Sequence, residues 1–155
     1  MATNVVRFLV SALVERPARR AGAERLAERL EASLTPLAAR YAAAADETKA
    51  GETLRHVIGI ERWGQRRLRV ALGDAAYERD EHHGYKPPDE RPLGALVDEL
   101  RATRAETVAL GRRLAAEGRS GVAVEHNGIG PLTAAGWLRY LQLHADLESR
   151  RVRAR

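Results

Sequence analysis

The 155-residue chain contains no cysteine. Disulfide bonds, thiolate zinc sites, iron–sulfur clusters and cysteine nucleophiles are therefore excluded. Aromatic residues are scarce, at 5%, which argues against a stacking platform for single-stranded nucleic acid. Lysine is also nearly absent, because Lys49 and Lys86 are the only two, so arginine carries almost all of the positive charge.

The chain has no long uninterrupted apolar run. The most apolar segment, residues 5–14, is broken by Arg7 and followed by Pro17. It is too short to span a bilayer, which takes about 20 apolar residues. It also lacks the long apolar region and small-residue cleavage site of a signal peptide. We therefore expect a cytoplasmic protein with no membrane partner.

Several catalytic signatures are missing as well. No glycine-rich phosphate loop follows a predicted strand, and no Gly-x-Ser-x-Gly nucleophile elbow is present. Glu-x-x-His at ligand spacing is absent, which argues against a ferritin-like di-iron bundle.

The charge is basic, with a net charge of +5 and a pI near 10.2. Arginines alternate with acidic residues along the predicted helices, for example in residues 23–31. Only the tail, residues 150–155, forms a basic run without acidic residues. This pattern favours a solvated helical surface over a nucleic-acid site.

Apolar residues recur at helical spacing nearly everywhere, and no segment alternates as a strand would. The pattern predicts an all-α, single-domain fold: a four-helix bundle with an extra N-terminal helix. Residues 1–17 form the N-terminal extension and residues 150–155 the tail. Pro36 leaves open whether residues 19–45 form one kinked helix or two. The other expected helices span residues 4–14, 52–72, 92–117 and 133–152. Long connections are expected at residues 74–91 and 118–131.

Three residues stand out as a possible metal site. His144 and Glu148 are four residues apart, so their side chains leave the same face of one helix. With His56 from another helix they would supply two imidazoles and one carboxylate, a normal ligand set for a divalent transition metal. The alternative is that these histidines are hydrogen-bonded residues of the core or its rim.

Other polar residues are weaker candidates. Glu52, one turn before the first histidine of this triad, is a fourth ligand, a partner of that imidazole, or a favourable charge in a helix's first turn. His82 and His83 are adjacent, so they do not easily chelate one ion together; we expect them to line the mouth of the bundle or face solvent. His126 is a weaker candidate of the same kind. Tyr85 either reaches over the site as a donor or packs in its loop.

Four stretches of the chain, taken in order, are similar to motifs of the DinB/YfiT-like superfamily of bacterial four-helix proteins. The resemblance runs from about residue 53 to 152. It implies up-down-down-up connectivity, a homodimer, and a divalent metal, nickel or zinc, held by three histidines. The matching stretches are Leu54–Trp63 with Arg67-Leu68, Tyr85-Lys86-Pro87, Gly130–Leu138, and His144.

Carried over by position, the first two family ligands are His56 and His144, and the third falls at Glu148. Glutamate can ligate zinc, iron or nickel, or it can mark a site that has lost its metal. Characterised members include transferases and isomerases that use low-molecular-weight thiols. The resemblance thus implies a metal-dependent transferase, isomerase or hydrolase with an unknown substrate. The alternative is a non-catalytic dimeric module with a degenerate site, acting in stress response or partner binding.

Overall fold

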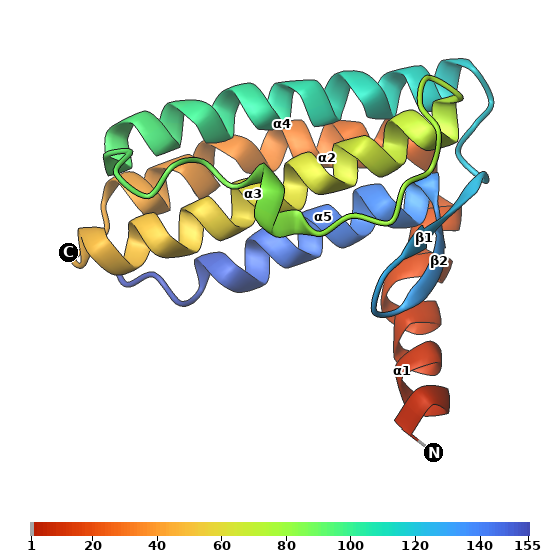
Figure 1. The fold of residues 1–155 in the computed structure, drawn as a ribbon, viewed down its shortest axis with the longest axis horizontal. Coiled ribbons are helices and arrows are strands. Elements are labelled where there is room, and N and C mark those ends of the chain that lie inside the picture. Colours follow the sequence, from red (N-terminus) through yellow and green to blue (C-terminus); the bar gives the residue numbers. More distant parts are fainter. Residues whose placement is uncertain (1) are drawn as a thin grey trace.

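The computed structural model describes residues 2–155, and its main body is a bundle of four long helices (Figure 1). A short helix, α1, precedes the bundle and leads into it through a π-helical turn, Ser11–Glu15. A two-stranded hairpin lies between the last two helices. The elements are α1 (Ala2–Val10), α2 (Arg16–Ala42), α3 (Glu47–Leu72), α4 (Leu93–Ala116), β1 (Ala123–His126), β2 (Gly130–Thr133) and α5 (Ala134–Ser149).

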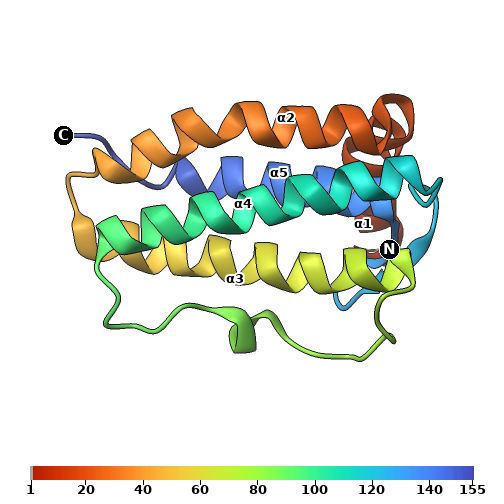
Figure 2. The same ribbon diagram turned by 90° about the horizontal axis from the view of Figure 1, so that it is seen from above.

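The four long helices follow up-down-down-up connectivity. In Figure 1, α3 and α4 run in the same direction, and α2 and α5 run in the opposite one. Both α2 and α3 pack against α4 and α5, so α2 and α3 occupy diagonal corners. The connection between α3 and α4 returns along the whole outer side of α3 (Figure 2) and contains a single 3₁₀ turn, His82–Tyr85. This loop and α5 therefore flank the same stretch of α3.

The predicted apolar faces account for most of the core. All seven apolar residues expected to point inward from α3 are buried, and Trp137 on α5 is fully buried. Leu147 is an exception, because its side chain is 58% exposed on the outer face of α5. The helix itself ends at Ser149, and Val152 is buried beyond it. The α3 residues are Leu54, Val57, Ile58, Ile60, Trp63, Leu68 and Leu72.

The N-terminal region differs from its prediction. Pro17 does not close the first helix but stands in the first turn of α2, where a missing N–H is tolerated. Helix α2 continues through Pro36, and its break lies at Gly22, whose φ of 76° and ψ of 164° suit only glycine. Among the residues that the structure describes, no helix combines the length and apolar character of a membrane span.

The hairpin corrects the expectation that the chain contains no strand, because β1 and β2 lie where a long connection was predicted. Its two strands are only four residues each and pair antiparallel, with Val124 opposite Leu132. Both of these side chains are buried, and the Trp137 indole donates to the Val124 carbonyl oxygen at 3.0 Å. Strands this short contain too few alternations for periodicity to reveal them.

The basic tail also differs from its prediction, because acidic residues do compensate it. Arg155 pairs with Glu47 at 2.7 Å, and Arg151 pairs with Glu148 at 3.1 Å. Ala154 forms an isolated antiparallel bridge with Ala44. The end of the chain is therefore docked across the start of α3.

Candidate metal centre

The three predicted ligands converge between α3 and α5. His56 lies on α3, and His144 and Glu148 lie one turn apart on α5, the helix packed beside it. The Nε2 atoms of His56 and His144 are 3.2 Å apart. Ligand atoms of all three residues lie within 4.8 Å of one another, so the group can hold a metal ion.

The chemistry and spacing of these donors fit a divalent transition metal. Two ligands of a tetrahedral ion at 2.0–2.1 Å stand about 3.3 Å apart, close to the 3.2 Å between the two imidazole nitrogens. A carboxylate as third donor leaves coordination positions for a further ligand. The donor set is therefore that of an open site.

All three side chains are half-buried, and this burial tunes the imidazoles. Burial lowers the pKa of His144 from 6.5 to about 4, with a further contribution from the charges of His56 and His82. The pKa of His56 is also lowered by burial, although the Glu148 carboxylate opposes this shift. Both rings are therefore neutral at pH 7, the form in which histidine binds metals.

Glu148 lies between a basic residue at the rim and a buried tyrosine inside the bundle. Arg151 donates to its Oε2 atom at 3.1 Å. Tyr41, on α2, is fully buried, and its hydroxyl has no hydrogen-bond partner among the described residues. Burial raises the pKa of Tyr41, and the Glu148 charge raises it further. The carboxylate is thus positioned by a basic residue at the rim and lies near an unused donor inside the bundle.

The connection between α3 and α4 brings only one of its two histidines to this group. The ring centroid of His82 is 5.3 Å from that of His56, in a T-shaped arrangement. His83 is exposed. Tyr85 does not reach over the site, because its hydroxyl donates to Asp80 at 2.5 Å. The expectation for the two histidines is confirmed, and the donor role suggested for Tyr85 is wrong.

Two further candidates lie outside the group. Glu52 is exposed, and it is not in the first turn of its helix, because α3 begins five residues earlier, at Glu47. His126 sits on β1 among the rings of Trp63, Trp137 and Tyr140, at centroid distances of 5.0, 5.2 and 4.9 Å. It belongs to the aromatic core.

Sequence patterns missed the polar network that anchors the long loop. Asp80 accepts from the Trp63 indole at 3.0 Å and from the Tyr85 hydroxyl at 2.5 Å. It also pairs at 2.7 Å with Arg67, whose side chain is completely buried although an outward arginine face was expected on α3. The Arg67 guanidinium lies 4.9 Å from the Trp63 ring centroid and 5.1 Å from that of Tyr77. No motif predicts a buried arginine between two aromatic rings.

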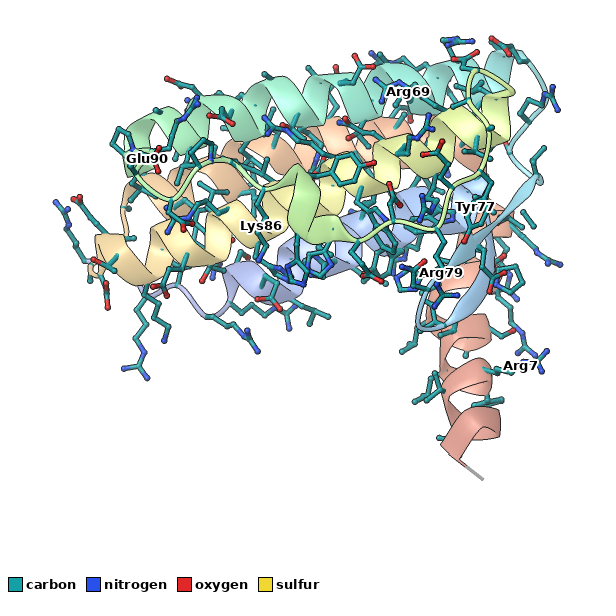
Figure 3. The ribbon with its side chains drawn as sticks, in the orientation of Figure 1. Arg7, Arg69, Tyr77, Arg79, Lys86 and Glu90 are labelled. Carbon is teal, nitrogen blue, oxygen red and sulfur yellow. The ribbon has the colours of Figure 1, made fainter. Side chains whose placement is uncertain are left out.

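Lys86 is a second residue that the patterns missed. It stands on the loop where the loop crosses α3 (Figure 3), and its charge lowers the pKa of both His56 and His82, after the larger effect of burial. An ammonium group therefore contributes positive potential at the rim of the candidate site.

No protein-family model, curated protein or solved structure matches this chain. The resemblance to the DinB/YfiT-like superfamily therefore depends on the motifs quoted above. The site must be interpreted from its own chemistry: two neutral imidazoles, one carboxylate and a basic rim.

Proposed function

We propose that the chain is a divalent-metal-dependent enzyme in which His56, His144 and Glu148 hold the ion. The observation that carries this proposal is the 3.2 Å approach of two imidazole nitrogens from different helices, with a carboxylate within 4.8 Å. A divalent ion at such a site lowers the pKa of a bound thiol or water, so that it acts as a nucleophile near neutral pH. The family resemblance implies nickel or zinc, and both metals accept imidazole ligands.

The protein's own residues would bind and orient the reacting groups. The neutral imidazoles need no deprotonation before they bind metal. Glu148, fixed by Arg151, brings one negative charge, so the loaded site stays positive overall. Lys86 adds to this potential, which favours an anionic group such as a thiolate in an open position. A low-molecular-weight thiol co-substrate, as the family resemblance implies, is consistent with this electrostatic setting.

Metal content tests the proposal directly. We expect about one divalent ion per chain in protein purified without a polyhistidine tag, measured by inductively coupled plasma spectrometry. His56→Ala and His144→Ala should reduce the content to background, whereas His83→Ala, which removes an exposed histidine outside the group, should not. Background metal in the wild-type protein would contradict the proposal.

Variants at Glu148 test whether this carboxylate serves as the third ligand in place of a histidine or marks a site that has lost its metal. We expect Glu148→Gln to weaken zinc binding by about tenfold or more, because an amide oxygen is a poorer ligand than a carboxylate. Unlike the Gln variant, Glu148→His should bind zinc tightly, because an imidazole is a good zinc ligand. Equal zinc affinity in the wild-type and Gln proteins would show that the carboxylate is not a ligand.

A second candidate function is partner binding through α1, and here we propose a second copy of the chain as the partner. Helix α1 projects from the bundle (Figure 1) and exposes apolar side chains: Val5 is 58% exposed and Phe8 64%, and Leu13 in the following turn is 59% exposed. Beside it lies a groove of about 700 Å³ lined in part by Ile129 and Pro131. One surface thus offers both an apolar helix and an apolar groove, the self-complementarity that a two-fold dimer needs.

Sedimentation of the full chain tests this assembly. We expect a dimer that becomes monomeric when Val5 and Phe8 are both changed to Glu. Leu147→Glu is the matched control, because Leu147 is equally exposed, at 58%, but lies on α5. A monomeric wild-type protein would exclude this second function without affecting the first.

A further inference from the structure

Lys86 is the loop residue that brings a positive charge to the rim of the candidate metal centre. We propose that it selects the ligand of the open coordination position: a small molecule with one metal-binding group and one carboxylate, which the Lys86 ammonium binds. This inference rests on the proposed function, because the metal must be in place for the first group to bind. An ammonium has no lone pair to offer a metal, so the open position stays available to that ligand.

The first support is the position of the lysine stem, which lies directly on α3 beside the first imidazole. A Cβ atom built on Gly59 would lie 2.7 Å from Cγ of Lys86 and 3.5 Å from its Cα. Gly59 is three residues after His56 and thus on the same side of the helix. The absence of a side chain at Gly59 is what allows the lysine stem to pack there. The loop therefore presents the ammonium on the side of α3 that carries the first imidazole.

The second support is that Lys86 has no acidic partner, unlike the arginines around it. All five arginines of α3 pair with carboxylates, three of which belong to the loop itself: Glu78, Asp80 and Asp89. Among the described residues, no carboxylate forms an ion pair with the Lys86 ammonium. Its charge is therefore available to an external anion. The α3 arginines are Arg55, Arg62, Arg66, Arg67 and Arg69.

The third support is the balance of charge around the imidazoles. Burial lowers the pKa of His56, and the Glu148 charge opposes this shift. The charges of Lys86 and Arg151 lower the same pKa further. In the loaded site a divalent ion and these two cations therefore face one carboxylate. A ligand with one negative group on the metal and another on the ammonium balances this charge better than a ligand with a single negative group. A single ammonium matches a singly charged group such as a carboxylate.

Binding of small thiols to the cobalt(II)-loaded, full-length protein tests the assignment, because a thiolate bound to cobalt(II) gives a strong near-ultraviolet charge-transfer band. Three thiols of similar length serve as probes: 3-mercaptopropionate with a negative end, 2-mercaptoethanol with a neutral end and cysteamine with a positive end. Lys86→Met should lower the affinity for 3-mercaptopropionate, relative to that for 2-mercaptoethanol, by about fivefold, the value of one exposed ion pair. Comparison of the variant with the wild type cancels the different acidities of the three thiols.

Further variants separate recognition of the carboxylate from a general loss of structure. Lys49→Met is the matched control, because Lys49 is the only other lysine and lies in the first turn of α3. It should change each of the three affinities by less than about twofold. Lys86→Arg should keep the wild-type preference for 3-mercaptopropionate. Lys86→Glu should move the preference toward cysteamine, a gain that a damaged fold does not produce.

The outcomes separate the two proposals. If Lys86→Met changes the affinity for all three thiols by the same factor, the lysine does not recognise the second group, and the assignment is overturned while the metal site stands. The same holds if Lys86→Glu leaves the preference unchanged, or if the cobalt-loaded wild type shows no charge-transfer band with any of the thiols. If the wild type binds neither zinc nor cobalt, both proposals fail.

Discussion

Two polar clusters inside the bundle lie only five residues apart on α3, and they differ in how completely their polar atoms are paired. Around Glu61, Arg104 donates to both carboxylate oxygens, at 2.7 and 3.0 Å, and Thr107 donates at 2.9 Å. Gln65 closes the cluster by donating to Thr107 at 3.0 Å. Around His56, two imidazole nitrogens instead face each other at 3.2 Å.

The difference separates a self-contained structural cluster from the candidate metal centre. Glu61 and Arg104 are almost fully buried, with side-chain exposures of 2% and 1%, and the remaining terminal nitrogen of Arg104 donates to the Leu30 carbonyl and the Ser33 hydroxyl of α2. Such a cluster needs no further partner and specifies how α3 and α4 pack. The group around His56 is half-exposed, and its two ring nitrogens and a carboxylate oxygen lie within 4.8 Å of one another, which is the arrangement of a group that can hold a metal ion.

The largest expected effect comes from leaving Glu61 unpaired. Arg104→Met removes its partner while Glu61 stays buried, so we expect a loss of about 3–5 kcal/mol in the free energy of unfolding, measured by urea denaturation. Zinc affinity of the folded variant should remain that of the wild type, because the cluster does not touch the candidate metal centre.

The control uses an ion pair of similar length in a different environment. Arg112 pairs with Glu31 at 2.7 Å, but the two side chains are 47% and 58% exposed. Arg112→Met should cost less than about 1 kcal/mol, because water screens an exposed pair. Equal losses in the free energy of unfolding for the two substitutions would show that the buried Glu61 cluster contributes no more to stability than an exposed ion pair.

The sequence was sufficient to predict the parts of this comparison that depend on periodicity. The end of α3 at residue 72 and the start of the last helix at residue 133 were both predicted, and Thr133 is the N-cap of α5. The shared face of His144 and Glu148 was also expected, because it follows from their four-residue spacing, whereas the placement of His56 beside them was implied only by the family resemblance. These features could be predicted because they depend on neighbouring residues or on the period of the helix.

The features that could not be predicted depend on contacts between distant segments. Nothing in the spacing around Arg67 distinguishes it from the exposed arginines of α3, since only the returning loop buries it against Asp80. His82 gains its position from the same loop. Helix α1 shows the opposite error: its apolar pattern predicts burial, but no other element of the described chain covers Phe8. Burial is decided by tertiary packing, which a single segment does not encode.

The second prediction concerns His126, a half-buried imidazole that belongs to neither cluster. Burial lowers its pKa from 6.5 to about 4, helped by the charge of Arg67. The unfolded chain therefore binds this proton more strongly between those two pH values, so stability should fall as the pH drops below about 6.5 and level off below about 4. His126→Phe should reduce the slope of this dependence by up to about 1.4 kcal/mol per pH unit, the value for one proton.

Urea denaturation between pH 4 and pH 7 measures this slope, and His83→Phe is the control because that histidine is exposed. We expect the control to keep the wild-type slope. If His126→Phe also keeps it, the imidazole is protonated equally in the folded and unfolded chains. The surroundings of His126 would then be open to solvent, unlike the enclosed Glu61 cluster.

The smallest expected effect tests whether the geometry of the candidate metal centre depends on the far end of α5. The Thr133 hydroxyl accepts from the Gly136 amide at 2.9 Å and contacts the Glu15 carboxylate at 3.0 Å. Thr133→Ala should therefore cost about 1 kcal/mol of stability, the usual value of a lost N-cap. Zinc affinity should not change, because His144 lies three turns further along the helix and is positioned by packing against α3. A matching loss of affinity would mean that the two imidazoles meet only while α5 is pinned at its start, and the candidate metal centre would then share the rigid, structural character of the Glu61 cluster.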